Sequence, residues 1–140
     1  MGYRNQFMLV VEGTDAQLEK LLAWANGRKE EELAKDALES EARRLSRFGW
    51  SVGESWSNLL RCLEPNRNTS NSGVGLTFTH DYMKCYDSWD EVVEEFHKFC
   101  TDNGVAFGYG RLGEDGADME FDDNDLGIQI GYARHLCSPF

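Results

Sequence analysis

The chain has 140 residues, of which 41% are hydrophobic, and its formal net charge at pH 7 is −11. This length and apolar content suit one folded domain over residues 1–140 and exclude a disordered polypeptide. The acidic excess argues against direct binding to nucleic acid or to anionic membranes, because like charges repel.

The first predicted elements are a strand and a helix. Residues 5–12 form a short, β-rich apolar run that is typical of a buried strand. Thr14 with Gln17 three residues later matches the capping box that opens a helix. Asn26 and Gly27 are expected to end or kink this helix. Its apolar stripe consists of Leu18, Leu21, Leu22 and Ala25.

A second helix is predicted over residues 29–47, because apolar residues recur there mostly every three or four positions. Residues 50–63 instead suggest two short strands, the first carrying Trp50 and Trp56 and broken by a glycine. Residues 64–72 are rich in Asn and Ser and predict a flexible loop. The apolar positions of the second helix are Leu33, Ala34, Ala37, Leu38 and Leu45.

The C-terminal half has clearer patterns. Apolar and small residues alternate over residues 73–80, which indicates a half-buried strand. A helix is predicted over about residues 89–102, capped by Asp87 or Ser88 and ended by Asn103-Gly104. Ser88 and Glu91 would form a second capping box. Three further alternating runs predict an antiparallel meander, and they cover residues 105–109, 119–121 and 126–132. The expected fold class is α+β, a mostly antiparallel sheet with helices packed on one face.

The negative charge is concentrated in the second half of the chain. Residues 1–70 carry 10 Lys and Arg against 11 Asp and Glu, a net charge of −1. Residues 71–140 carry 4 against 14, a net charge of −10. Solubility alone does not require such clustering, so the asymmetry favours a binding surface for a basic partner.

Two segments hold most of these carboxylates. On the predicted helix over residues 89–102, a rotation of about 100° per residue separates an apolar arc from an acidic arc, with Lys98 as the main offset. On the predicted strand over residues 119–121 and its flanks, acidic residues alternate with apolar ones and are expected to share an outer face. The predicted partner-binding residues are Asp90, Glu91, Glu94, Glu95, Asp118, Glu120, Asp122 and Asp123.

No metal or cofactor is expected. Asp123 and Asp125 precede Gly127, but the spacing departs from the EF-hand loop and leaves only adventitious binding of divalent ions. His97 and Cys100 do not match the paired ligand spacing of structural zinc sites.

The candidates for catalysis lack a supporting motif. His80, Cys85 and His97 are the residues that a small hydrolase or a metal enzyme would use. No glycine-flanked elbow or phosphate loop accompanies them. We therefore expect a non-enzymatic protein, with bound metal or a reactive thiol as the findings that would change this interpretation.

The cellular location is expected to be the cytoplasm. No apolar run approaches the roughly 20 residues of a membrane helix, and no signal-peptide core follows Met1. In a reducing compartment the cysteines are expected to remain thiols rather than to form two disulfides. They are Cys62, Cys85, Cys100 and Cys137.

In size, charge and the acidic segment over residues 87–125, the chain resembles the small acidic inhibitors that phages and plasmids direct against host defence, the anti-CRISPR and anti-restriction proteins. The order of elements around Ser88–Phe121 also resembles ferredoxin-like proteins of phages and plasmids. The first resemblance implies a DNA mimic that binds a basic, nucleic-acid-binding protein or complex of the host.

Two function classes follow. The first is a protein-binding inhibitor whose carboxylates occupy a nucleic-acid-binding groove, with exposed Trp50 or Trp56 adding apolar contact. The alternative is a non-enzymatic ferredoxin-like accessory domain of a mobile element, in which the acidity serves only solubility. Salt separates them, because only the first predicts a salt-sensitive partner. The oligomeric state is left open.

Overall fold

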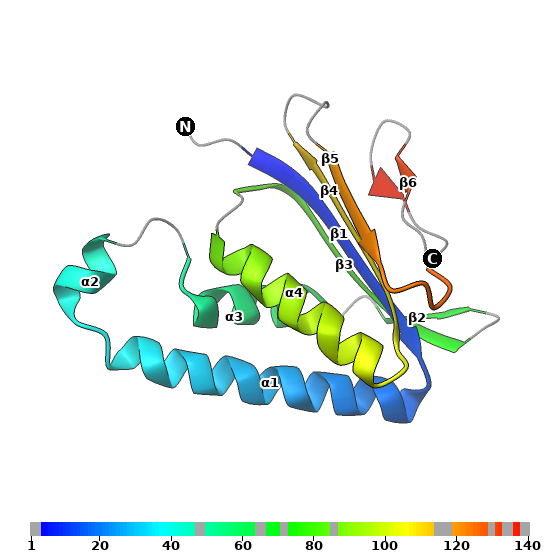
Figure 1. Cartoon of the computed structure of the whole chain (residues 1–140), viewed down its shortest axis with the longest axis horizontal. Coiled ribbons are helices and arrows are strands. Elements are labelled where there is room, and N and C mark those ends of the chain that lie inside the picture. The colour runs from blue at the N-terminus through cyan, green and yellow to red at the C-terminus, as the bar shows by residue number, and fades with distance from the viewer. Residues whose placement is uncertain are drawn as a thin grey trace.

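The computed structural model describes residues 4–46, 50–63, 67–70, 73–84, 87–113, 119–128, 131–132 and 136–137. Within these ranges the chain forms an α+β fold, as the sequence predicted (Figure 1). The elements in chain order are β1 (Arg4–Gly13), α1 (Asp15–Ala37), α2 (Glu41–Ser46), α3 (Val52–Leu63), β2 (Arg67–Ser70), β3 (Gly73–Lys84), α4 (Asp87–Asp102), β4 (Ala106–Gly113), β5 (Met119–Asp123), β6 (Gly131–Tyr132) and β7 (Leu136–Cys137).

Five strands form one sheet in the order β2-β3-β1-β4-β5, and every neighbouring pair is antiparallel. Strands β1 and β2 therefore run parallel with β3 between them, and β3 and β4 run parallel with β1 between them. This is the split β-α-β arrangement used twice. It is compatible with the ferredoxin-like similarity, which itself stays a prediction.

The sheet separates two layers of different thickness. Helices α1, α3 and α4 cover one face, and β6 lies on the opposite side (Figure 1). Alternate residues of β1 point to the two faces, so Leu9 joins the large core under the helices and Val10 joins a small cluster with Ala106 and Ile128. The largest fully buried side chains of the main core are Trp56, Trp89, Phe7, Phe96 and Phe107.

Helix α1 begins as predicted but extends further. The Thr14 hydroxyl accepts a hydrogen bond from the backbone N–H of Gln17 at 3.2 Å, and the Gln17 side chain accepts one from the Thr14 N–H at 2.9 Å, which confirms the capping box. The predicted break at Asn26 and Gly27 is wrong, because the helix continues without interruption to Ala37. The Asn26 side chain instead donates to the backbone oxygen of Leu22 within the helix.

The predicted second helix over residues 29–47 is also wrong. Its first part belongs to α1, and its last part is the separate short helix α2. Its proposed apolar stripe is not buried, since Leu38 is 88% exposed and Leu45 is 74% exposed. Figure 1 shows why, because α2 lies at the end of the molecule farthest from the sheet.

Residues 52–63 form helix α3 where the sequence analysis placed strands. Its buried residues follow helical spacing and leave a single apolar side that faces the core. The side chain of Ser51 caps the helix by accepting a hydrogen bond from the Glu54 N–H at 3.0 Å. The residues of α3 in the core are Trp56, Leu59, Leu60 and Leu63.

Three smaller corrections concern the predicted loop, the second capping box and the last strand. Residues 67–70 form β2, which pairs with β3, so the predicted loop over 64–72 contains a strand. Ser88 lies inside α4 and donates to the backbone oxygen of Trp50 at 2.7 Å instead of forming a capping box with Glu91. The described part of the predicted strand over 126–132 is a bend with exposed Leu126, followed by the short β6.

Candidate partner-binding face

Helix α4 presents a row of carboxylates because its apolar residues occupy the opposite side. Trp89, Phe96 and Cys100 are fully buried against the sheet and the neighbouring helices. The side chains of Asp90, Glu91 and Glu94 are exposed. The predicted separation of an apolar arc from an acidic arc is therefore confirmed for α4.

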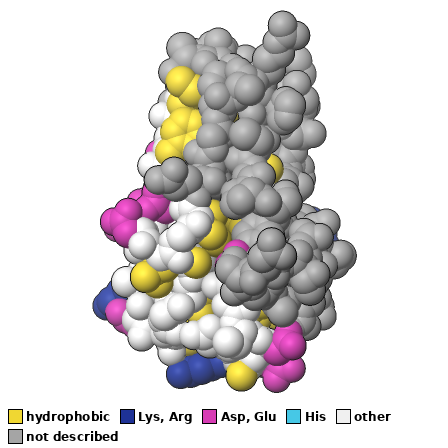
Figure 2. All heavy atoms as spheres, turned by 90° about the vertical axis from the view of Figure 1, so that its right-hand side faces the viewer, with side chains coloured by type: hydrophobic (Ala, Val, Ile, Leu, Met, Phe, Trp, Pro, Cys, Tyr) yellow, Lys and Arg dark blue, Asp and Glu magenta, His cyan; other side chains and the backbone are white. Residues whose placement is uncertain are grey.

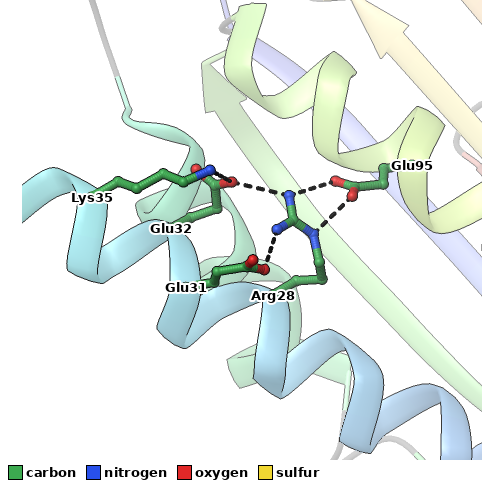
Figure 3. Close-up of polar contacts among 5 residues, drawn as sticks. All are labelled: Arg28, Glu31, Glu32, Lys35 and Glu95. Carbon is green, nitrogen blue, oxygen red and sulfur yellow. Dashed lines mark hydrogen bonds and ion pairs between the residues drawn. The ribbon is translucent and has the colours of Figure 1, made fainter.

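Glu95 is part of an ion-pair cluster with α1 (Figure 3). Arg28 of α1 donates from Nε and from an Nη atom to the two oxygens of Glu95, at 2.7 Å and 3.2 Å. The same guanidinium contacts Glu31 at 2.6 Å and Glu32 at 3.0 Å. The hydrogen bond to Glu95 is the main cause that raises the pKa of Arg28 above its ordinary value.

The Arg28 cluster changes the predicted role of Glu95. A bidentate contact between a guanidinium and a carboxylate fixes the geometry of both groups. It joins two helices that are 67 residues apart in sequence. Glu95 thus has a structural role, and the exposed carboxylates of the predicted row on α4 are those of Asp90, Glu91 and Glu94.

Strand β5 carries Glu120 and Asp122 toward the helix side of the sheet. Asp122 pairs with Tyr109 and Glu120 pairs with Arg111 in the register of β5 with β4. Tyr109 belongs to the core under the helices, so its register partner and the residue two positions away share that face. Glu120 and Asp122 share one face as predicted, but the expectation of an outer face is wrong, because this is the face on which the helices pack.

The two acidic segments lie next to each other. The Nδ1 atom of His97 on α4 lies 2.8 Å from Oδ2 of Asp122 on β5. The His97 ring also stacks on Phe107 of β4, with ring centroids 4.5 Å apart and an angle of 12° between the planes. His97 therefore connects the exposed side of α4 to the β5 edge of the sheet, which the sequence could not show.

One of the predicted carboxylates, Asp123, does not join this face. Asp123 follows Asp122 and so points to the other side of the strand, where its Oδ1 accepts a hydrogen bond from the Asp125 N–H at 2.9 Å. This contact closes the turn after β5. Asp118 lies outside the described residues.

The expected exposed tryptophans are not exposed. Trp56 is fully buried and meets Trp24 in a T-shaped contact with ring centroids 5.4 Å apart. Trp50 is partly buried and packs against the core, with its ring 6.3 Å from that of Trp89. Both residues stabilise the packing of α3 and α4, so the predicted apolar contact through them is wrong.

The end of β5 is held by Asn124. Its Nδ2 atom donates to the backbone oxygen of Val105 at 2.8 Å, and its Oδ1 atom accepts from the Phe107 N–H at 3.0 Å. The backbone N–H of Asn124 donates to the Phe107 oxygen at 3.3 Å. These three bonds fix the position of β5 relative to the end of α4.

Two of the residues considered for metal binding, His97 and Cys100, lie in the described part of the chain. No group of three or more His, Cys, Asp or Glu side chains within the described residues has the arrangement of a metal site. Cys100 is buried, and this burial raises the pKa of its thiol above the ordinary value. Cys85 and the side chain of His80 lie outside the described residues.

Comparisons with known protein families, curated proteins and solved structures found no match to this chain. Among the described residues, no helix is both long enough and apolar enough to cross a membrane.

Two residues that join the elements of this face were not predicted from the sequence. They are Arg28, which joins α1 to α4, and His97, which joins α4 to β5. Arg28 stands in a run of charged residues, and His97 was considered only as a metal ligand or a catalytic residue. Their contacts are with residues 67 and 25 positions away in the chain. No local pattern encodes such partners.

Proposed function

We propose that this protein is a binding protein that occupies a basic, nucleic-acid-binding surface of another protein. The observation that carries the proposal is the His97–Asp122 contact at 2.8 Å, which joins the acidic side of α4 to the acidic edge strand β5. This face carries the exposed carboxylates of Asp90, Glu91 and Glu94 on α4 and of Glu120 and Asp122 on β5, and Lys98 is the one Lys in these two elements.

The charge spacing on α4 supports mimicry of a nucleic acid backbone. Asp90, Glu91 and Glu94 span five residues, which correspond to about 7.5 Å of helix axis at 1.5 Å per residue. Three carboxylates over this length give roughly one charge per 2.5 Å. Duplex DNA carries one charge per about 1.7 Å of its axis. The local density on this part of α4 is therefore roughly two thirds of that of the ligand it would replace.

The arrangement is also costly for a surface that serves solubility alone. A pair of like charges four residues apart, such as Asp90 and Glu94, destabilises a helix by about 0.2–0.5 kcal/mol. Interspersed lysines would give the same solubility without that cost. A basic partner compensates the repulsion and speeds association by electrostatic attraction.

The biological setting is part of the proposal. The resemblance to anti-CRISPR and anti-restriction inhibitors implies that the partner is a host defence complex in the cytoplasm. In the alternative, the chain is an accessory domain whose acidity has no partner. The charge density on α4 favours the inhibitor.

The experiment is a pull-down from host lysate with two charge variants of equal net charge. Glu91→Lys with Glu94→Lys changes the proposed face, and Glu19→Lys with Glu30→Lys changes exposed positions on α1. Each double variant has a net charge of −7, since two reversals add 4 to −11.

We expect the wild type and the α1 variant to retain a basic partner at about 50 mM salt and to release it by about 200 mM. The α4 variant should retain none at either concentration. Equal retention by both variants, or a partner that salt does not release, would contradict the proposal and favour the accessory domain.

A further inference from the structure

Strand β5 is an edge of the five-stranded sheet, and within this sheet it pairs with β4 alone. The backbone N–H of Asn124 donates to Phe107 of β4, so Asn124 points its backbone groups toward β4. Because these directions alternate in an antiparallel pair, Asp122 and Glu120 also point toward β4. The backbone groups of Met119, Phe121 and Asp123 therefore point away from β4, and no strand in the described part of the chain pairs with them.

The two faces of this edge have different chemistry. Glu120 and Asp122 lie on the helix side, and their side chains are 54% and 50% exposed. Their contacts with Arg111 and His97 each use one carboxylate oxygen. Met119 and Phe121 lie on the opposite side of the strand and are 43% and 44% exposed. Figure 2 shows acidic and hydrophobic side chains close together on this side of the molecule.

We propose that β5 binds an extended segment of the partner protein as an additional strand, and that in this segment Lys or Arg alternates with apolar residues. The inference rests on the proposed function, because it names the part of the basic partner that docks. Strand addition uses backbone hydrogen bonds for affinity and alternating side chains for specificity. The basic residues meet Glu120 and Asp122, and the apolar residues cover Met119 and Phe121.

Charge complementarity selects this occupant over a second copy of the chain. Two β5 strands paired edge to edge would bring Glu120 and Asp122 of one copy beside the same residues of the other, and opposed like charges are destabilising. Native edge strands also use charged side chains to prevent such self-pairing. A basic segment removes the repulsion and covers the apolar side.

The test uses the whole chain and two synthetic peptides. The first is a ten-residue peptide of alternating Lys and Val, and the second is the same peptide with N-methyl groups on alternate residues. N-methylation keeps the charge and side chains but removes the donors needed for strand pairing. Affinity is measured by titration, and hydrogen exchange is measured at the backbone amides of β5 and α4.

We expect the first peptide to bind and to slow exchange at the amides of Phe121 and Asp123, which point outward. The methylated peptide should bind at least about tenfold more weakly, as the loss of two or three backbone hydrogen bonds implies. In the protein, Met119→Thr with Phe121→Thr should also weaken binding, since Thr keeps the strand preference and removes apolar surface.

Equal affinity of the two peptides, absence of binding, or protection confined to α4 would overturn the inference. A dimer of the chain that buries β5 would also overturn it. These failures are distinguishable from failure of the proposed function, because that proposal depends on the Glu91 and Glu94 variants losing the partner from lysate.

Discussion

Replacing Gly53 with alanine should destabilise the protein, because helix α3 packs tightly against α1 at this residue. A Cβ atom at Gly53 would lie 2.6 Å from Oδ2 of Asp36, 2.9 Å from Cδ2 of Leu33 and 2.9 Å from the backbone nitrogen of Leu33. The backbone contact cannot be relieved by a change of side-chain rotamer. The Asp36 oxygen also accepts a hydrogen bond from Ser51 at 2.6 Å, so moving it breaks a second contact.

The expected magnitude follows from two opposing effects. Overpacking of this kind costs about 1–3 kcal/mol. Alanine has the higher helix propensity and returns at most about 1 kcal/mol, less in the first turn, where Gly53 lies. The net loss in the free energy of unfolding should be about 1–2 kcal/mol.

Gly27 provides the matched control. It lies inside α1, and a Cβ atom there would have no neighbour within 4 Å. Gly27→Ala should therefore stabilise the protein by about 0.5–1 kcal/mol. Urea denaturation followed by circular dichroism measures both changes. A Gly53→Ala variant as stable as the wild type would refute the close approach of α3 to α1, and a destabilised Gly27→Ala variant would refute the continuous helix.

Three further predictions concern single contacts. Asn124→Ala should cost about 1–3 kcal/mol, because it leaves the Val105 oxygen and the Phe107 N–H without their side-chain partners, and an unchanged urea midpoint would contradict this. Arg28→Met should destabilise the protein more than Lys29→Met does, because only Arg28 joins α1 to Glu95 of α4; equal denaturation midpoints would count against that link. Cys100 should resist thiol reagents at pH 8 in the folded protein and react after unfolding, since burial raises the pKa of its thiol; peptide mapping that finds it modified in the folded state would show the burial to be wrong.

The parts of the fold that the sequence predicted correctly are those encoded by local patterns. The capping box of Thr14 and Gln17 involves residues three positions apart. The apolar arc of α4 follows from helical spacing within one element. The end of α4 at Asn103-Gly104 was also correct, because Gly104 has a φ of +70° that glycine adopts at little cost.

The errors arose where tertiary packing overrides local preference. Trp50, Val52 and Trp56 favour strands by propensity, but the spacing from Val52 through Trp56 to Leu63 also fits a helix, and packing against α1 and the sheet selects the helix. Asn26 and Gly27 favour a helix end, but α1 continues because its two halves pack against α3 and α4.

The candidate site was predicted in composition but not in arrangement. Charge counting identified α4 and β5, and helical periodicity separated Asp90, Glu91 and Glu94 from the core. The neutralisation of Glu95 by Arg28 and the contact of His97 with Asp122 depend on how distant segments come together. Such contacts follow from how the helices and strands pack together and not from any pattern within a segment.

The most direct test of the central claim is a competition experiment on the purified partner. Labelled duplex DNA is bound to the partner, and the wild-type chain or the variant with Glu91→Lys and Glu94→Lys is added in increasing amounts. The account predicts that the wild type displaces the DNA and that the variant does not. A ternary complex in which the partner holds the DNA and the wild-type chain together would contradict it.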